Sequence, residues 1–229
     1  MRTSCIRTLL ASSLVLAVAS TAHAVPILRL TTSGGATQTI MDGDANDANS
    51  LAGAVVYTTA MGPEWLVNVT TGLSKPLLGL ASAPELDLNS VDVSSIGGGW
   101  LEIELTDTGF TAQDAAYFLA SIGGTTNGSV SYKTYMDSSN LAFGQGTELT
   151  SFSALGPAFS NTAGVILTSA AEYSLTLLVR VTHAGIQASS FDATVKVPEP
   201  ATLLLFGAGI LGLAAARRTG RGAPKPEKT

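Results

Sequence analysis

Apolar and polar residues alternate over short stretches in the middle of the chain, and glycine, asparagine, aspartate and serine separate these stretches. A period of two residues is typical of β-strands that bury one face. The alternation predicts strands at residues 27–30, 54–58, 65–70, 85–93, 100–105, 129–136, 172–183 and 191–197. Within residues 85–93 the parity changes at Asn89 and Ser90, which predicts a bulge or a break between two strands. Residues 151–168 are only weakly patterned.

One segment departs from this alternation. Residues 111–119 read as a short helix, with Thr111 as the N-cap and Asp114 three residues later. No repeat of 20 to 50 residues is visible, which argues against solenoids and propellers. Many short strands between turn signals predict an all-β fold, an antiparallel two-sheet sandwich that is jelly-roll-like and carries one short helix.

The N-terminal residues have the pattern of a secretory signal peptide. Arg2 and Arg7 form a positive region, residues 9–19 are apolar, and Ala22 and Ala24 frame an A-x-A cleavage site. We therefore expect residues 1–24 to be removed. The stretch is too short for a membrane anchor, and its small-residue site also argues against one.

The C-terminal residues contain three consecutive features. Pro198, Glu199 and Pro200 cannot continue a helix or a central strand, because proline fixes φ and lacks a backbone donor. The next 16 residues, 201–216, carry no charge and would form a helix of about 24 Å. A hydrocarbon core is about 30 Å thick, so this membrane helix would be short. A basic cluster then marks a cytoplasmic end, residues 217–229, and comprises Arg217, Arg218 and Arg221.

The apolar stretch has two other interpretations. A buried core helix is disfavoured because it would show a polar face. Residues 207–212 also match G-x-G-x-x-G, the dinucleotide-binding fingerprint. That fingerprint requires a preceding strand, a following amphipathic helix and an acidic residue about 20 positions later, whereas here prolines precede it and 17 residues follow Gly212. Small residues packed in a membrane helix explain these glycines better.

Residues 198–229 resemble the sorting tail of PEP-CTERM proteins, through the P-E-P sequence, the apolar span and the arginines. A Gly/Pro/Lys extension after the arginines, residues 220–229, departs from the usual pattern. The resemblance implies recognition and cleavage by an exosortase, a membrane-embedded processing enzyme, at Pro198, Glu199 and Pro200. It also implies a protein of a Gram-negative-type bacterium that is exported, transiently anchored in the inner membrane and then found at the cell surface or outside. Residues 67–76 also resemble the β-rich bodies of such substrates, which are often associated with exopolysaccharide and biofilm.

These features divide the chain into a signal peptide (1–24), an exported domain (25–197) and a sorting tail (198–229). The exported domain has 5 basic and 15 acidic residues, a formal net charge of −10. A domain without a basic patch is not a nucleic-acid-binding domain. Because Cys5 lies in the signal peptide, the mature chain has no disulfide and no thiolate metal site.

Residues 42–49 hold the best local candidate for a metal site. Asp42, Asp44, Asn46 and Asp47 place oxygen ligands close together in one loop, as a hard cation such as calcium requires. The spacing does not match an EF-hand. The alternative is an Asx-rich turn between strands, which these residues also favour. No other cofactor is expected.

The sequence gives little support for an enzyme. His183 is the single histidine of the mature chain, and we expect it at a strand end in water. No nucleophile-elbow G-x-S-x-G accompanies it. Glu102 and Glu104 are spaced i, i+2, so on a strand they share the outward face. Such a pair fits glycoside hydrolysis, but a solvated face is the more common reason for it.

Aromatic residues offer a second link to carbohydrates. A stacking platform for sugars would draw on Trp65, Trp100, Tyr117, Tyr132 and Tyr135, although most of these should be core residues. We therefore expect a non-enzymatic surface or matrix protein whose partners are an exosortase, the membrane and exopolysaccharide. The alternative is a carbohydrate-binding module or glycan-active enzyme exported by the same route.

Overall fold

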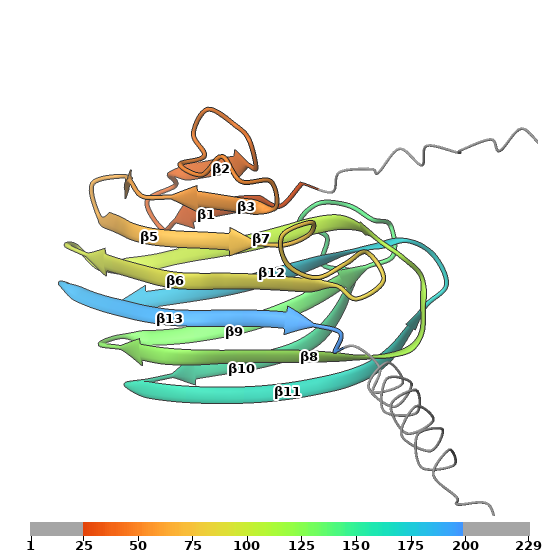
Figure 1. Ribbon diagram of the computed structural model, residues 1–229. Helices are drawn as coiled ribbons and strands as arrows, with labels where there is room; N and C mark the ends of the chain where they lie inside the picture. The colour runs from red at the N-terminus through yellow and green to blue at the C-terminus, as the bar shows by residue number, and fades with distance from the viewer. Residues whose placement is uncertain (1–24, 199–229) are drawn as a thin grey trace, which may run out of the picture.

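The computed structural model describes residues 25–198, which form two antiparallel β-sheets packed face to face and no helix (Figure 1). The strands of sheet A are β1 (Ile27–Thr32), β2 (Thr37–Met41), β7 (Gly99–Phe110), β9 (Ser129–Asp137), β10 (Thr147–Leu155) and β12 (Tyr173–His183). The strands of sheet B are β3 (Ala54–Tyr57), β4 (Ala60–Met61), β5 (Trp65–Leu73), β6 (Glu85–Ser95), β8 (Gln113–Thr126), β11 (Ala158–Ser169) and β13 (Gln187–Lys196). This confirms the predicted all-β sandwich.

The last eight strands have the topology of a jelly roll. From β6 to β13 the chain changes sheet at every step except between β9 and β10, and the strand orders are β10-β9-β12-β7 in sheet A and β11-β8-β13-β6 in sheet B. The first strands extend both sheets on the same side. β1 and β2 continue sheet A beyond β7, and β5 and β3 continue sheet B beyond β6, with β4 paired to β5.

The core lies between the sheets and is built from the predicted alternation. Leu101, Ile103 and Leu105 of β7 are fully buried, as their shared parity predicts. The other central strand of sheet A, β12, contributes Leu175, Leu177, Val179 and Val181. The side chain of Tyr132 extends from sheet A across the core. Its hydroxyl donates a 2.5 Å hydrogen bond to the carbonyl oxygen of Thr194 in sheet B.

The predicted break at Asn89 and Ser90 is a bulge within one strand. β6 runs unbroken from Glu85 to Ser95, its register against β13 shifts between Leu88 and Val91, and Ser90 has a φ of 55°. The extra residue moves the buried side chains from Leu86 and Leu88 to Val91 and Val93.

The predicted helix at residues 111–119 is wrong, because this stretch begins the longest strand, β8. Ala116 and Phe118 point into the core, whereas Tyr117 points outward and is 46% exposed. The outward-facing residues of this stretch are apolar too, so the sequence shows no alternation of apolar and polar residues here. Residues 113–119 form a strand because β8 pairs with β11 on one side and with β13 on the other. Tertiary context here overrides local propensity.

Candidate functional site

The outer face of sheet A presents polar residues in rows that run across the strands. On β7, Glu104 lies opposite Arg29 of β1 on one side and Leu178 of β12 on the other. Lys133 of β9 continues this row. The neighbouring row contains Thr31, Glu102, Arg180 and Ser131.

Each of these rows contains an arginine–glutamate pair. The Nε of Arg29 donates a 2.6 Å hydrogen bond to Oε2 of Glu104. The Nη2 and Nε of Arg180 lie 2.6 Å and 2.8 Å from Oε1 of Glu102. Charge-assisted hydrogen bonds of this kind hold both partners in one orientation.

An aromatic ring lies against each guanidinium group. Arg29 lies 3.9 Å from the centroid of the Phe143 ring, and Arg180 lies 4.5 Å from that of the Trp100 ring. A guanidinium on an aromatic face gains about 0.5–1 kcal/mol at exposed sites. Each arginine is therefore held by a glutamate carboxylate and by an aromatic ring.

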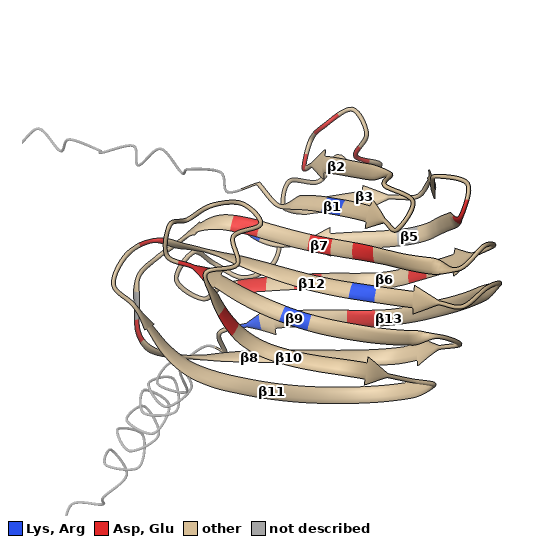
Figure 2. Ribbon diagram, turned by 180° about the vertical axis from the view of Figure 1, so that it is seen from behind, with Lys and Arg blue, Asp and Glu red and all other residues tan. Residues whose placement is uncertain are grey.

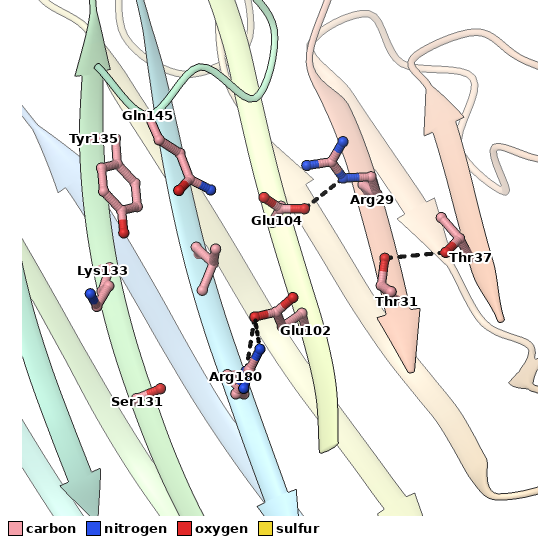
Figure 3. A pocket seen from close by; sticks show the side chains of 11 residues that line it. Arg29, Thr31, Thr37, Glu102, Glu104, Ser131, Lys133, Tyr135, Gln145 and Arg180 are labelled. Carbon is pink, nitrogen blue, oxygen red and sulfur yellow. Dashed lines mark hydrogen bonds and ion pairs between the residues drawn. The ribbon is translucent and has the colours of Figure 1, made fainter. Parts of the chain in front are cut away.

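These residues surround an open hollow of about 690 Å³ (Figure 3). Its walls are lined by Arg29, Thr31, Thr37, Glu102, Glu104, Ser131, Lys133, Tyr135, Gln145, Leu178 and Arg180. Donors and acceptors from five neighbouring strands face the hollow, together with Gln145 from the loop between β9 and β10. Small-molecule sites commonly have volumes of 300–1,000 Å³.

The loop of residues 138–146 closes one end of the hollow and is tied to the sheet beneath it. The backbone N–H of Phe143 donates to Oγ1 of Thr106 at 3.1 Å, and Ser174 Oγ donates to the carbonyl oxygen of Leu141 at 2.6 Å. Phe143 has a φ of 58°, a conformation that bulky residues rarely adopt. At Gly144 a Cβ atom would overlap the Asp137 carboxylate, so the loop needs glycine there. These contacts place the Phe143 ring on Arg29.

Most of the domain's basic side chains line the hollow. Arg29, Lys133 and Arg180 are three of the five basic residues of the exported domain, and Figure 2 shows this face with basic residues in blue. Their partners are Glu104, Glu148 and Glu102, with Lys133 3.0 Å from Glu148. Three cations and three carboxylates balance, so this face is nearly neutral although the domain is strongly acidic.

The sequence identified only part of this site. Glu102 and Glu104 share the outer face of one strand, as predicted. Both glutamates were expected to be exposed to solvent. This expectation is wrong for Glu104, which is 4% exposed because Arg29 covers it. The arginines and Lys133 were missed as site residues. Arg29 and Arg180 each lie between two apolar neighbours on a strand, which is their signal in the sequence, but the strand order that brings them together cannot be read from it.

In the predicted calcium loop, the aspartate carboxylates accept hydrogen bonds from backbone N–H groups. Asp47 accepts hydrogen bonds from the backbone N–H groups of Gly43, Asn49 and Val56. Asp42 accepts from Gly53 at 2.6 Å, and Asp44 accepts from Met41 at 3.0 Å. Residues 25–198 contain no group of three or more side chains of the kinds His, Cys, Asp and Glu placed to hold a metal ion. This pattern is that of an Asx-rich turn, and calcium binding by Asp42, Asp44, Asn46 and Asp47 stays a prediction.

His183 lies at a strand end as expected, but the expectation that it faces water is wrong. It is 2% exposed and stacks on Trp65, with 4.8 Å between the ring centroids. Its Nδ1 and Nε2 lie 2.8 Å from the hydroxyl oxygens of Ser95 and Ser189. Burial lowers the pKa of His183, so this buried network favours the neutral imidazole.

The five aromatic candidates divide between core and surface. Trp65 and Tyr132 are core residues, and Tyr135 is nearly buried with one edge on the hollow. Trp100 is half-buried beneath Arg180, and Tyr117 is exposed on the outer face of sheet B. The structure therefore does not bring the five together into one stacking platform.

The fold and the hollow define a jelly-roll domain with a polar, charge-balanced surface site. The C-terminal residues 196–218 match the PEP-CTERM protein-sorting motif. The chain is therefore an exported protein of a Gram-negative-type bacterium, sorted through the membrane with an exosortase as its processing partner. The match begins at Lys196, the last residue of β13.

Most residues of the predicted sorting and signal features lie outside the described part of the chain. These are Ala22, Ala24, Glu199, Pro200, Arg217, Arg218 and Arg221, with the predicted membrane helix 201–216. Pro198 is described and is exposed directly after β13. No helix within residues 25–198 is long and apolar enough to cross a membrane.

Several solved structures have similar folds at low identity. The carbohydrate-binding module TmCBM61, in complex with β-1,4-galactotriose, is 10% identical, with 61% of this chain and 91% of that chain covered and a TM-score of 0.34. The K1 cleaved adhesin domain of Lys-gingipain from Porphyromonas gingivalis W83 is 13% identical, with coverages of 69% and 97% and a TM-score of 0.36. The PA14 sugar-binding domain from an RTX adhesin is 11% identical, with coverages of 76% and 90% and a TM-score of 0.32. No curated protein matches the sequence.

Proposed function

We propose that the exported domain is a non-enzymatic carbohydrate-binding protein of the cell surface or extracellular matrix, associated with exopolysaccharide. The observation that carries the proposal is the hollow on sheet A, where Arg29–Glu104 and Arg180–Glu102 form two pairs, each with an aromatic ring against its arginine. We name this surface the paired-arginine face.

The chemistry of this face suits sugar hydroxyl groups. Each hydroxyl both donates and accepts, and the face offers guanidinium donors beside carboxylate, amide and hydroxyl acceptors. Glu102 uses one carboxylate oxygen for Arg180, which leaves the other oxygen for a ligand, whereas Glu104 is covered by Arg29 and orients it. The arginine pairs hold these side chains before a ligand arrives, which lowers the entropic cost of binding.

The balance of charge indicates the kind of glycan. Three cations and three carboxylates cancel across the face, so a polyanion would gain little from it. A neutral oligosaccharide can use both signs of charge as hydrogen-bond partners. The open shape of the hollow suits a segment of a longer chain.

The same pairs favour binding over hydrolysis. A glycosidase uses one carboxyl group as an acid and a second as a nucleophile or base. Here both carboxylates already accept hydrogen bonds from an arginine of the domain, which suits a binding surface.

A glycan array with the mature chain tests the proposal. Wild type should bind neutral oligosaccharides, and Arg29→Ala and Arg180→Ala should each weaken binding about tenfold or more, since arginine is a frequent hot-spot residue. Lys196→Ala is the matched control, because Lys196 pairs with Glu85 on sheet B at 3.6 Å. Binding by no neutral glycan, or equal loss in the control, would overturn the proposal. Release of reducing sugar would instead support the enzymatic alternative.

The sorting tail completes the proposed route. Residues 201–216 would hold the chain in the inner membrane while the exosortase cuts at Pro198, Glu199 and Pro200, and the domain would then reach the surface or matrix. The motif match at residues 196–218 supports this order of events.

A further inference from the structure

We propose that two copies of this chain pair along β11, joining their B sheets into one continuous sheet. β11 is the outermost strand of sheet B and pairs only with β8 among the described strands. Its other edge therefore presents unpaired backbone groups, which are a template for another strand.

β11 lacks the features that usually protect an edge strand. It contains 12 residues, Ala158–Ser169, with no charge and no proline. It pairs with β8 without interruption from Ala158 to Leu167, with one register shift after that. At about 3.4 Å per residue it extends for roughly 40 Å. Long, regular and uncharged edges of this kind favour strand pairing.

The other edge strands are protected. β2 and β3 have 5 and 4 residues, too short to offer much pairing. β10 is interrupted by two register shifts and has a positive φ at Ala154, and it carries Glu148. Short strands, bulges and charges are the usual means of blocking an edge. Among the edge strands of residues 25–198, only β11 is long, uncharged and regular over ten consecutive residues, Ala158 to Leu167.

The hydrophobic core is also incompletely covered at this margin. The apolar residues that pack on the core but remain partly exposed are concentrated on the two strands of this side: Phe152 and Leu155 on β10, and Phe159, Val165 and Leu167 on β11. β10 and β11 lie one above the other at the same margin of the sandwich (Figure 1). A partner at this margin would cover those side chains and pair with the free edge in one step.

The absence of charge identifies the partner as a second copy. In a two-fold interface each residue near the axis meets its own copy, so any charge there repels itself. The domain carries 15 acidic and 5 basic residues, yet none lies on β11. Antiparallel pairing of β11 with its own copy therefore has no like-charge contact along the strand.

The test introduces charge at two exposed positions of β11, Thr162 and Ile166. Both side chains lie on the outer face, where substitution disturbs no core contact. We expect the mature chain, residues 25–229 in a density-matched detergent, to sediment as a dimer. The double variants Thr162→Lys/Ile166→Lys and Thr162→Glu/Ile166→Glu should each sediment as a monomer. An equimolar mixture of the two should recover the dimer, because opposite charges then meet.

The control is Thr39→Lys, an exposed threonine on β2 at the opposite margin, which should remain dimeric. Circular dichroism of each variant confirms that the strands are retained. Recovery in the mixture separates pairing from simple loss of folding, which mixing would not reverse. A monomeric wild type, a dimeric lysine variant, or a mixture that stays monomeric would each overturn the proposal.

Discussion

The Nε atom of Arg29 lies 2.6 Å from Oε2 of Glu104, although the two residues are 75 positions apart in the sequence. β1 and β7 are neighbours in sheet A, and their register places these side chains directly opposite each other. Phe143, from a third segment, covers the same arginine. The paired-arginine face is thus assembled by topology, from strands whose outward charged residues Arg29, Glu104 and Arg180 each lie between two buried residues.

A buried ion pair anchors the end of the sandwich beside residues 74–84. Lys75 Nζ lies 3.1 Å from Oδ2 of Asp107 and 3.7 Å from the centroid of the Phe110 ring. Burial raises the pKa of Asp107 and lowers the pKa of Lys75, and the charge of each partner offsets part of this. Asp107→Asn should lower the free energy of unfolding by about 3–5 kcal/mol, because it leaves a buried charge unpaired.

Urea denaturation measures this effect. The matched control is Glu148→Gln, which breaks the exposed Lys133–Glu148 pair and should leave the free energy of unfolding nearly unchanged. Similar losses in the two variants would contradict the role given to the buried pair.

His183 should make stability depend on pH. Its pKa is lowered in the folded state by burial, from an ordinary value of 6.5. The unfolded chain therefore binds the proton more readily, so this contribution to stability is complete above about pH 6.5 and is lost as the pH falls below it. Thermal melts between pH 8 and pH 5 should show a steeper loss for wild type than for His183→Gln. Parallel curves for the two proteins would show that the imidazole does not titrate as expected.

Asp47 should stabilise the loop between β2 and β3. Its carboxylate accepts three backbone hydrogen bonds, whereas that of Asp44 accepts one. We expect Asp47→Ala to lower the melting temperature more than Asp44→Ala, since it removes the acceptor of three backbone N–H groups instead of one. Equal effects would contradict the capping role. Melts with calcium and with chelator test the calcium prediction in the same samples, because a bound ion raises stability by mass action.

The sorting tail gives a prediction in cells. Replacing Pro198, Glu199 and Pro200 with alanine should leave export intact and accumulate an uncut, membrane-bound form. Immunoblotting of membrane and extracellular fractions measures this, and alanine at Lys225 and Lys228, beyond the arginine cluster, serves as control. A variant that still leaves the membrane shortened by the mass of the tail would show that the P-E-P sequence is not the recognition element.

Local patterns predicted most of the fold, and long-range pairing accounts for the failures. The alternation of Leu101, Ile103 and Leu105 on β7 identified the buried face correctly, because a half-buried strand must alternate. Residues 111–119 were predicted as a helix because apolar residues occupy both faces of β8 there. β11 was missed because it is an edge strand whose inward residues are only half-buried.

The site was harder to predict than the fold for the same reason. The outward position of Glu102 and Glu104 follows from parity, but their arginine partners depend on which strands become neighbours. His183 was placed in water because the sequence shows only that it lies at a strand end. Trp65, Ser95 and Ser189, which bury it, come from three other strands.

The location of a bound glycan tests the central claim most directly. In a two-dimensional amide NMR titration of the mature chain with a neutral oligosaccharide, we expect shifts to cluster on Arg29, Glu104, Leu178 and Arg180 of sheet A. The amides of Glu85 and Lys196 on sheet B should stay unchanged. Shifts confined to sheet B, or no shifts at saturating glycan, would contradict the account.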